Sequence, residues 1–216
     1  MSTRRRVQIT LVRDRAHYDE VVMGAVARAR VSVWIATANV KGVRVEAPLG
    51  TRARARGAYV SALSMFADLA ARGVELRMLH AGVPSRAFRE DLRAEQRLAG
   101  GALAMRRCPR VHLKMIAVDG AALYLGSANF TGAGLGAKGD RRRNFEAGVL
   151  TDDDVLLDEM QGAFDAIWSG KECGRCALRA VCPAPLDTIA HAAAPAREIA
   201  PASPLRPRAR SRKSSA

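Results

Sequence analysis

The pair Asp119-Gly120 constrains the fold of this chain more than any other short feature. It stands between two apolar runs in the stretch VHLKMIAVDGAALYLGSANF (111–130). Two-residue β-hairpin turns favour Asp-Gly, because both turn residues must adopt a positive φ. We therefore predict a hairpin with a two-residue loop, in which Val118 pairs with Ala121.

This register predicts which polar side chains share one face of the hairpin. His112 is expected opposite Ser127, and Lys114 lies two residues from His112 on the same face. Asn129 is the diagonal neighbour of His112. Four polar groups would gather where a strand could have buried apolar ones, which indicates a functional site.

These four side chains have a common chemistry. A neutral imidazole is a nucleophile or a general base near pH 7. Lysine supplies a positive charge for a phosphate oxygen, and serine and asparagine donate hydrogen bonds to the same anion. No carboxylate cluster suited to Mg²⁺ accompanies them, so the pattern favours covalent phosphoryl transfer without a metal.

The surrounding sequence alternates between strand-like and helix-like segments. VSVWIATANV (31–40) is continuous and β-branched, as in a strand that is buried on both faces. Strand, helix and strand in this order predict a right-handed parallel crossover. Helices are expected at 18–30, 59–71, 86–98 and 152–168, and strands at 31–40, 74–80, 103–107 and 144–150, with a basic loop at 47–57.

The hairpin residues resemble a known motif. His112-x-Lys114, then Asp119, then Gly126-Ser127-x-Asn129 are similar to the HKD motif of the phospholipase D superfamily. The resemblance covers residues 31–150. It implies an α/β fold, with a mixed β-sheet flanked by helices on both faces in an α-β-α sandwich.

The resemblance also implies roles for the site residues. His112 would attack phosphorus and form a phosphohistidine, while Lys114 and Asn129 hold the phosphate and Ser127 supports them. The family places a glutamate shortly after this segment, hydrogen-bonded to the other ring nitrogen of the nucleophile, and Glu146 fits that position. Asp119 belongs to the motif, but its place in the turn gives it a structural role as well.

The chain carries one such motif, whereas the chemistry implied by the family needs two. His17, His80 and His191 have no lysine two residues further on. The smallest members of the family bring two copies of the motif together by homodimerisation. We therefore expect a homodimer here.

Net charge bears on the substrate. The chain has a formal charge of +14, which favours a polyanionic partner, nucleic acid before anionic lipid. Six arginines on two loops are candidates for substrate binding, although arginine runs are also common on solvated faces. They are Arg52, Arg54, Arg56, Arg141, Arg142 and Arg143.

Three activities therefore remain open. We expect a metal-independent phosphodiesterase, with backbone-directed cleavage of DNA or RNA in the manner of an endonuclease. A lipid phosphodiesterase of the phospholipase D type is the enzymatic alternative. A nucleic-acid-binding module without turnover is the alternative from another class.

The four cysteines form a second candidate site. Cys173, Cys176 and Cys182 follow the spacing Cys-x2-Cys-x5-Cys, and Cys108 would complete four thiolates. The segment resembles the C-terminal cluster of RecB-like nucleases, which implies a structural [4Fe-4S] cluster. A Zn²⁺ ion and unligated thiols are the alternatives, and no cofactor is expected to be needed for catalysis itself.

These features suggest an organisation into three parts. We expect a phospholipase D-like catalytic domain at 1–170, a cysteine-rich metal-binding segment packed on it at 171–187, and a disordered basic tail rich in Pro, Ala and Arg at 188–216. The first residues lack the apolar block of a secretory signal, and no apolar run is long enough for a transmembrane helix. A cytoplasmic location is expected.

Overall fold

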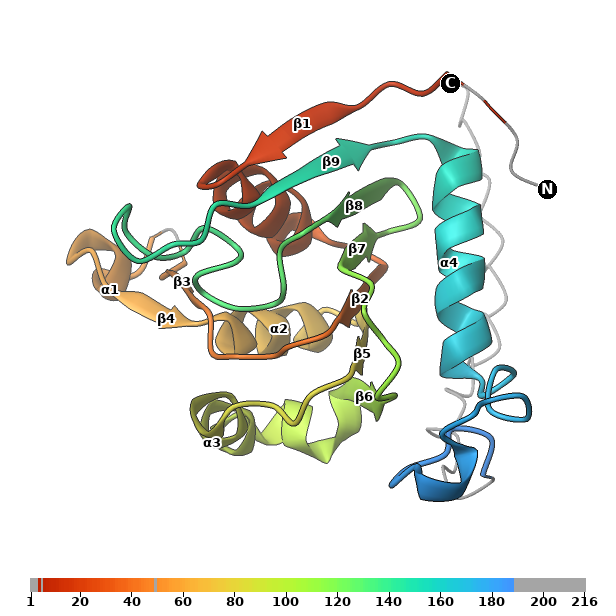
Figure 1. Cartoon of the computed structure of the whole chain (residues 1–216). Coiled ribbons are helices and arrows are strands. Elements are labelled where there is room, and N and C mark those ends of the chain that lie inside the picture. Colours follow the sequence, from red (N-terminus) through yellow and green to blue (C-terminus); the bar gives the residue numbers. More distant parts are fainter. Residues whose placement is uncertain (1–3, 5, 49, 189–216) are drawn as a thin grey trace, which may run out of the picture.

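The main element of the fold is a seven-stranded mixed sheet (Figure 1). The structure, a computed structural model, describes residue 4 and residues 6–48 and 50–188. The strand order is β1-β9-β8-β7-β2-β5-β6, in which β2, β5 and β6 run parallel and the remaining pairs antiparallel. The strands are β1 (Thr10–Arg13), β2 (Ser32–Thr37), β5 (Glu75–His80), β6 (Leu103–Arg107), β7 (Met115–Val118), β8 (Ala122–Gly126) and β9 (Ala147–Thr151).

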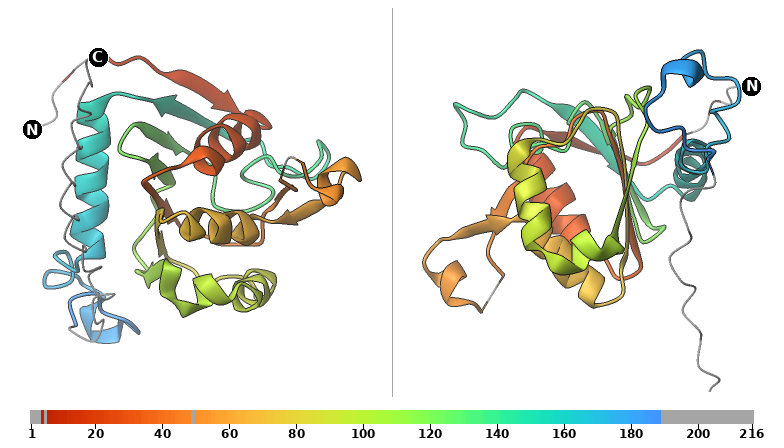
Figure 2. Two further views of the ribbon diagram at one scale, coloured as in Figure 1. Left: turned by 180° about the vertical axis from the view of Figure 1, so that it is seen from behind. Right: turned by 90° about the horizontal axis from the view of Figure 1, so that it is seen from below.

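Helices cover both faces of this sheet (Figure 2). One face carries the helical segments η1, η2, α2, α3 and η3, and the other carries the long helix α4. Their bounds are η1 (His17–Ala25), η2 (Val26–Arg28), α2 (Ala62–Ala71), α3 (Arg86–Ala94), η3 (Leu98–Ala102) and α4 (Asp154–Trp168). The predicted mixed sheet between two helical layers is thus confirmed.

The buried positions of β2 explain why its sequence is apolar throughout. Val33 and Ile35 join the core beneath the α2 side, whereas Ala36 packs into the second core with Phe164 of α4. A strand covered on both faces needs apolar residues at consecutive positions. The parallel pairing of β2 with β5, with α2 between them in the chain, confirms the predicted crossover.

Two features differ from the expected elements. Strand β1 was not predicted, because a four-residue edge strand with three exposed positions leaves almost no pattern. Residues 59–71 were expected to be one helix, but Tyr59–Ser61 form strand β4, which pairs with β3 (Arg44–Glu46) in a small second sheet. The basic loop between β3 and β4 contains the short helix α1 (Arg52–Ala55).

The Asp-Gly pair lies at the hairpin turn as predicted, but the predicted two-residue loop and its register are wrong. Asp119 and Gly120 have φ of 56° and 63°, and the Ala121 N–H donates to the Val118 carbonyl at 2.9 Å. However, Val118 pairs with Ala122 and not with Ala121. One extra residue at the turn acts as a bulge and moves every facing pair by one position.

The segment after α4 folds back against the end of that helix. Gly170 has φ of +78°, and a Cβ there would lie 2.4 Å from the backbone nitrogen of Asp187. Only glycine allows the returning chain to approach so closely. Leu186 and Cys173 pack with Phe164 against the sheet. The tail predicted to be disordered lies, from residue 189 onward, outside the described residues.

None of the helices in the described ranges has the length and apolar character needed to cross a bilayer.

Candidate active site

The motif residues lie at the ends of three neighbouring strands. His112 and Lys114 stand on the loop that leads into β7, while Ser127 and Asn129 directly follow β8. Glu146 directly precedes β9. The Gly126 N–H donates to the Lys114 carbonyl at 3.2 Å, so the two halves of the motif are joined through backbone.

His112 and Lys114 contact each other directly. The Lys114 ammonium lies 3.0 Å from His112 Nδ1 and 3.3 Å from Nε2, and it donates to the His112 backbone carbonyl at 2.9 Å. His112 is exposed, whereas the other two histidines of the described chain, His17 and His80, are buried. An exposed imidazole beside a cation is accessible to an anionic substrate.

Asn129 is held in a fixed orientation. Its Oδ1 accepts a hydrogen bond from the Asn39 N–H at 3.1 Å and lies 3.3 Å from Thr37 Oγ1. Thr37 Oγ1 also accepts from the Phe130 N–H at 2.9 Å. Because the oxygen of the amide is occupied, its NH₂ group remains as the donor for a phosphate oxygen.

Ser127 and Glu146 form a second pair. The Ser127 hydroxyl donates to Glu146 Oε2, and Asn144 Nδ2 donates to Glu146 Oε1 at 3.0 Å. The backbone N–H of Glu146 donates to Asp14 Oδ1 at 3.2 Å. Within the described part of the chain, Glu146 bonds Ser127 and not His112.

Asp119 lies at the opposite end of β7 and has a structural environment. Its carboxylate accepts hydrogen bonds from the backbone N–H groups of Arg30, Val31 and Ser32 at 2.7 to 3.1 Å. Burial of the carboxylate, the largest single effect, raises its pKa, but these three donors and the Arg30 charge outweigh it. The net pKa of Asp119 therefore lies below its ordinary value. Its contacts are with the start of β2.

Two loops carry the candidate arginines, and both project from the same side of the domain (Figure 1). Arg54 forms an ion pair with Glu46, and Arg143 pairs with Asp140 at 2.7 Å. The exposed guanidinium groups that are most available to a ligand are those of Arg52, Arg56, Arg141 and Arg142.

Sequence reasoning missed the residues that support the motif. Thr37 and Asn39 orient Asn129, while Asp14 and Asn144 hold Glu146. Thr37 ends a buried strand, and polar residues at the carboxyl ends of such strands frequently line sites. That signal was available; Asp14 has no comparable pattern.

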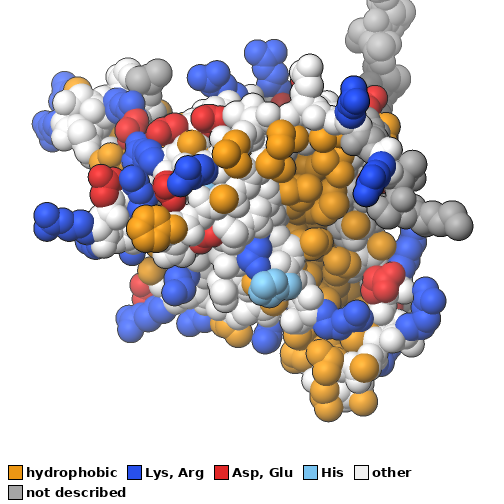
Figure 3. All heavy atoms as spheres, turned by 45° about the horizontal axis from the view of Figure 1, so that its top comes forward, with side chains coloured by type: hydrophobic (Ala, Val, Ile, Leu, Met, Phe, Trp, Pro, Cys, Tyr) orange, Lys and Arg blue, Asp and Glu red, His pale blue; other side chains and the backbone are white. Residues whose placement is uncertain are grey.

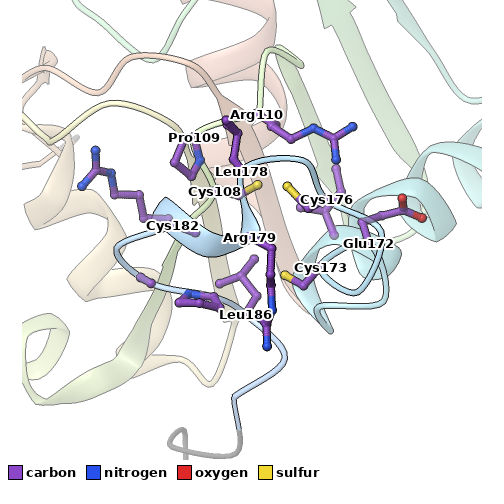
Figure 4. Close-up of a pocket in the computed structure, with 14 residues that line it drawn as sticks. Cys108, Pro109, Arg110, Glu172, Cys173, Cys176, Leu178, Arg179, Cys182 and Leu186 are labelled. Atoms are coloured by element: carbon purple, nitrogen blue, oxygen red, sulfur yellow. The ribbon is translucent and has the colours of Figure 1, made fainter.

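The four cysteines line one cavity of about 30 Å³ (Figure 4). Cys108 follows β6, and the other three belong to the segment after α4. Among the described residues, no three His, Cys, Asp or Glu side chains stand in an arrangement that holds a metal ion directly.

Comparisons with known proteins define the class. The family model described as "Cardiolipin synthase, PLD-like domain" matches residues 22–168. Since this covers more than half of the chain, the protein belongs to this family of phospholipase D-like domains. Curated protein sequences give no significant match.

Several solved structures are similar to this chain, and those with a TM-score of 0.50 or more show the same fold. Nuc from Salmonella typhimurium, a phospholipase D family member, is 18% identical with a TM-score of 0.51, over 76% of this chain and 95% of its own. NucT from Helicobacter pylori is 16% identical with a TM-score of 0.48, over 74% and 94%. Polyphosphate kinase from Porphyromonas gingivalis is 14% identical with a TM-score of 0.50, over 76% and 26%.

Proposed function

We propose that this protein is a metal-independent phosphodiesterase that hydrolyses DNA or RNA through a phosphohistidine at His112. The observation that carries the proposal is the exposed imidazole of His112 beside the Lys114 ammonium at 3.0 Å. Membership of the phospholipase D-like family supports phosphodiester chemistry. Asn129 is proposed to add an amide donor, whose orientation is set by its bond from the Asn39 N–H.

The reaction would proceed in two displacements. The free nitrogen of neutral His112 attacks phosphorus, and the bond from phosphorus to the leaving oxygen breaks. A second imidazole protonates that oxygen. Lys114 and Asn129 bind the non-bridging oxygens, so Lys114 exchanges its contact with the imidazole for one with phosphate. Water then attacks the phosphohistidine, which regenerates histidine and releases a phosphate monoester.

The Ser127–Glu146 pair would act by position and charge. The carboxylate accepts from Ser127 and Asn144, which leaves it fixed at the start of β9. A fixed negative charge near the site stabilises the imidazolium of a site histidine whenever that histidine carries a second proton. We propose this role for Glu146, with Ser127 as its link to the loop of Asn129.

The second imidazole is proposed to come from a second copy of the chain. A row of apolar residues crosses the sheet next to the site, from buried Met115 through Leu125 and Val149 to Leu11, which is 63% exposed. Figure 3 shows a band of hydrophobic side chains with an exposed histidine at its edge. Exposed apolar surface of this kind is typical of subunit interfaces.

Subunit mixing tests the shared site. Wild-type protein is co-expressed with increasing proportions of His112→Ala protein carrying a different tag. If both copies of His112 serve one site, activity at equal amounts falls to about one quarter, whereas independent sites give about one half. A linear decline, or only monomers in sedimentation at micromolar concentration, contradicts the dimer.

Leu11→Glu should weaken association, while Val31→Glu, at a position that is 64% exposed and outside the row, should not.

Nucleic acid is the preferred substrate because of charge. The formal charge of +14 and the exposed arginines of both loops support binding to a phosphate backbone. The double variant Arg141→Ala, Arg142→Ala should reduce the steepness with which the logarithm of the binding constant falls against the logarithm of the salt concentration. The expected reduction is about two, one for each lost phosphate contact. Arg86→Ala, on helix α3, is the matched control and should leave the slope unchanged.

One assay separates the three activities that the sequence left open. Purified protein in EDTA is incubated with single- and double-stranded DNA, RNA and phosphatidyl lipid vesicles, beside His112→Ala. Cleavage of nucleic acid that survives EDTA and disappears in His112→Ala supports the proposal. A labelled phosphoryl group, bound covalently to the protein and released by acid, should be trapped on the wild-type protein alone. Lipid cleavage would establish the lipid phosphodiesterase instead. Binding without turnover would establish the silent module, and a requirement for added Mg²⁺ would refute the mechanism.

A further inference from the structure

The cavity lined by the four cysteines has features that the phosphodiesterase chemistry does not use. Cys108 reaches it from the loop before His112, and Cys173, Cys176 and Cys182 reach it from the segment after α4. In Figure 4, the sulfurs of Cys108 and Cys176 point toward one another. Two parts of the chain that are far apart in sequence thus place their thiols around one space.

The backbone winds around this space in regular turns. The N–H groups of Cys173, Cys176 and Cys182 donate to carbonyls three residues earlier, at 2.9, 3.1 and 3.4 Å. Cys108 is fixed independently, because its N–H donates to the His80 carbonyl at 2.9 Å. The turns present these cysteines in succession to the same cavity.

The cysteine segment has almost no core of its own. Across 171–187 only Leu186 is buried, at 6% exposure, while Leu178 and Val181 are 42% and 76% exposed. A short segment of turns buries too little apolar area to offset the entropy of ordering it. Such segments are commonly held by a metal or by disulfides.

The charges around the cavity suit an anionic centre. Arg107, Arg110 and Arg179 line it together with the carboxylate of Glu172, and Arg179 also forms an ion pair with Asp187. Four thiolates around a divalent ion carry a net charge of about −2, which nearby guanidinium groups stabilise.

We propose that Cys108, Cys173, Cys176 and Cys182 bind one thiophilic metal centre through four thiolates, either Zn²⁺ or an iron–sulfur cluster. The thiols as they lie are not gathered on a single point, so they turn toward the cavity when the metal binds and each releases its proton. The centre ties the segment 171–187 to Cys108. Cys108 lies four residues before His112 in the sequence, so the same centre anchors the loop that carries the proposed nucleophile.

Metal content of the full chain tests this proposal without any reference to activity. The protein is produced in medium with added zinc and iron, purified without oxygen, and its zinc, iron and acid-labile sulfide are measured. We expect either about one zinc per chain or about four irons with matching sulfide and visible absorption. Cys108→Ser and Cys182→Ser should each lower metal occupancy at least about tenfold.

The control is Leu178→Ala, because Leu178 lines the same cavity but supplies no thiol. It should retain the metal. In the Cys108→Ser variant, amide hydrogen exchange across 171–187 should increase at least about tenfold, while exchange in β2 and β5 stays unchanged. This local measurement also shows whether the variant is folded.

Three results would overturn the proposal. The first is a protein without metal under these conditions, and the second is a Cys108→Ser variant with unchanged metal content. The third is a pair of disulfides among the four cysteines, found by mass spectrometry after alkylation. None of them bears on whether His112 cleaves a phosphodiester, so the two proposals stand or fail separately.

Discussion

Asp119 gives the sharpest prediction, because the sequence assigns it to a catalytic motif and the structure assigns it to the fold. Its carboxylate accepts three backbone N–H groups at the start of β2. At about 1 kcal/mol for each hydrogen bond of a partly exposed carboxylate, these contribute about 3 kcal/mol. Alanine in the left-handed conformation, where Asp119 has φ of 56°, costs about 1 kcal/mol more.

Asp119→Ala should therefore lower the free energy of unfolding by about 4 kcal/mol, which is a fall in Tm of roughly 8 to 16 °C for a domain of this size. Asp119→Asn is the matched variant. Asparagine tolerates the same backbone conformation, and its Oδ1 can keep the bonds from Val31 and Ser32. It should cost only about 1 to 2 kcal/mol.

The pH dependence checks the same reasoning. Because the pKa of Asp119 is lowered in the folded protein, its contribution is fully present above the ordinary pKa of about 4 and is lost as the pH falls below that value. Urea unfolding at several pH values should show the difference between wild type and Asp119→Asn shrinking as the pH falls below about 4. A difference that grows on acidification would contradict this account.

Activity decides whether Asp119 is structural. At a temperature where both proteins are folded, Asp119→Asn should cleave phosphodiesters at a rate within about threefold of wild type. The reason is that, among the described residues, the carboxylate bonds the start of β2 and no other motif residue. A folded Asp119→Asn protein with a loss comparable to that of His112→Ala would refute the structural role.

Further substitutions probe the packing and the support of the site. Gly126→Ala would place a Cβ 2.3 Å from the buried Tyr124 hydroxyl, so it should lower the free energy of unfolding in urea by about 2 to 3 kcal/mol. Gly162 is exposed within α4, and a Cβ there meets no other atom. Gly162→Ala should therefore raise the free energy of unfolding by about 0.5 to 1 kcal/mol. Thr37→Val removes a hydroxyl that contacts Asn129 and should lower kcat about tenfold at nearly constant KM, a result that a KM effect alone would contradict.

The motif itself could be predicted from sequence because its residues are close together in the chain. His112, Lys114, Ser127 and Asn129 all flank one hairpin, and the Asp-Gly pair marked the position of its turn, though not the length of the loop. The extra residue in the register could not be predicted. The same turn is bound to the start of β2 through the Asp119 N–H and carboxylate, a tertiary contact that a local sequence pattern does not contain.

The edge strand and the small sheet were missed for a related reason. β1 has only one buried residue, Val12, and its existence depends on pairing with β9 near the other end of the domain. Tyr59 to Ser61 carry a helix-like pattern, yet their pairing with β3 outweighs it. Short elements take their structure from their partners, and single-sequence patterns do not contain the partners.

The same distinction explains how the candidate site is built. Two motif side chains are oriented by residues far along the chain, Asn129 by Asn39 and Asp119 by Arg30 to Ser32. The backbone N–H of Glu146 is likewise bound by the distant Asp14. Asn39 and Ser32 lie next to or on β2, an inner strand of the sheet that is covered on both faces. The buried strand β2 thus fixes the position of the hairpin at both ends. At the turn it does so through Asp119, and at the site through Asn129. His112 itself lies outside the strands, so its imidazole can turn between Lys114 and a phosphorus atom while the groups around it stay fixed.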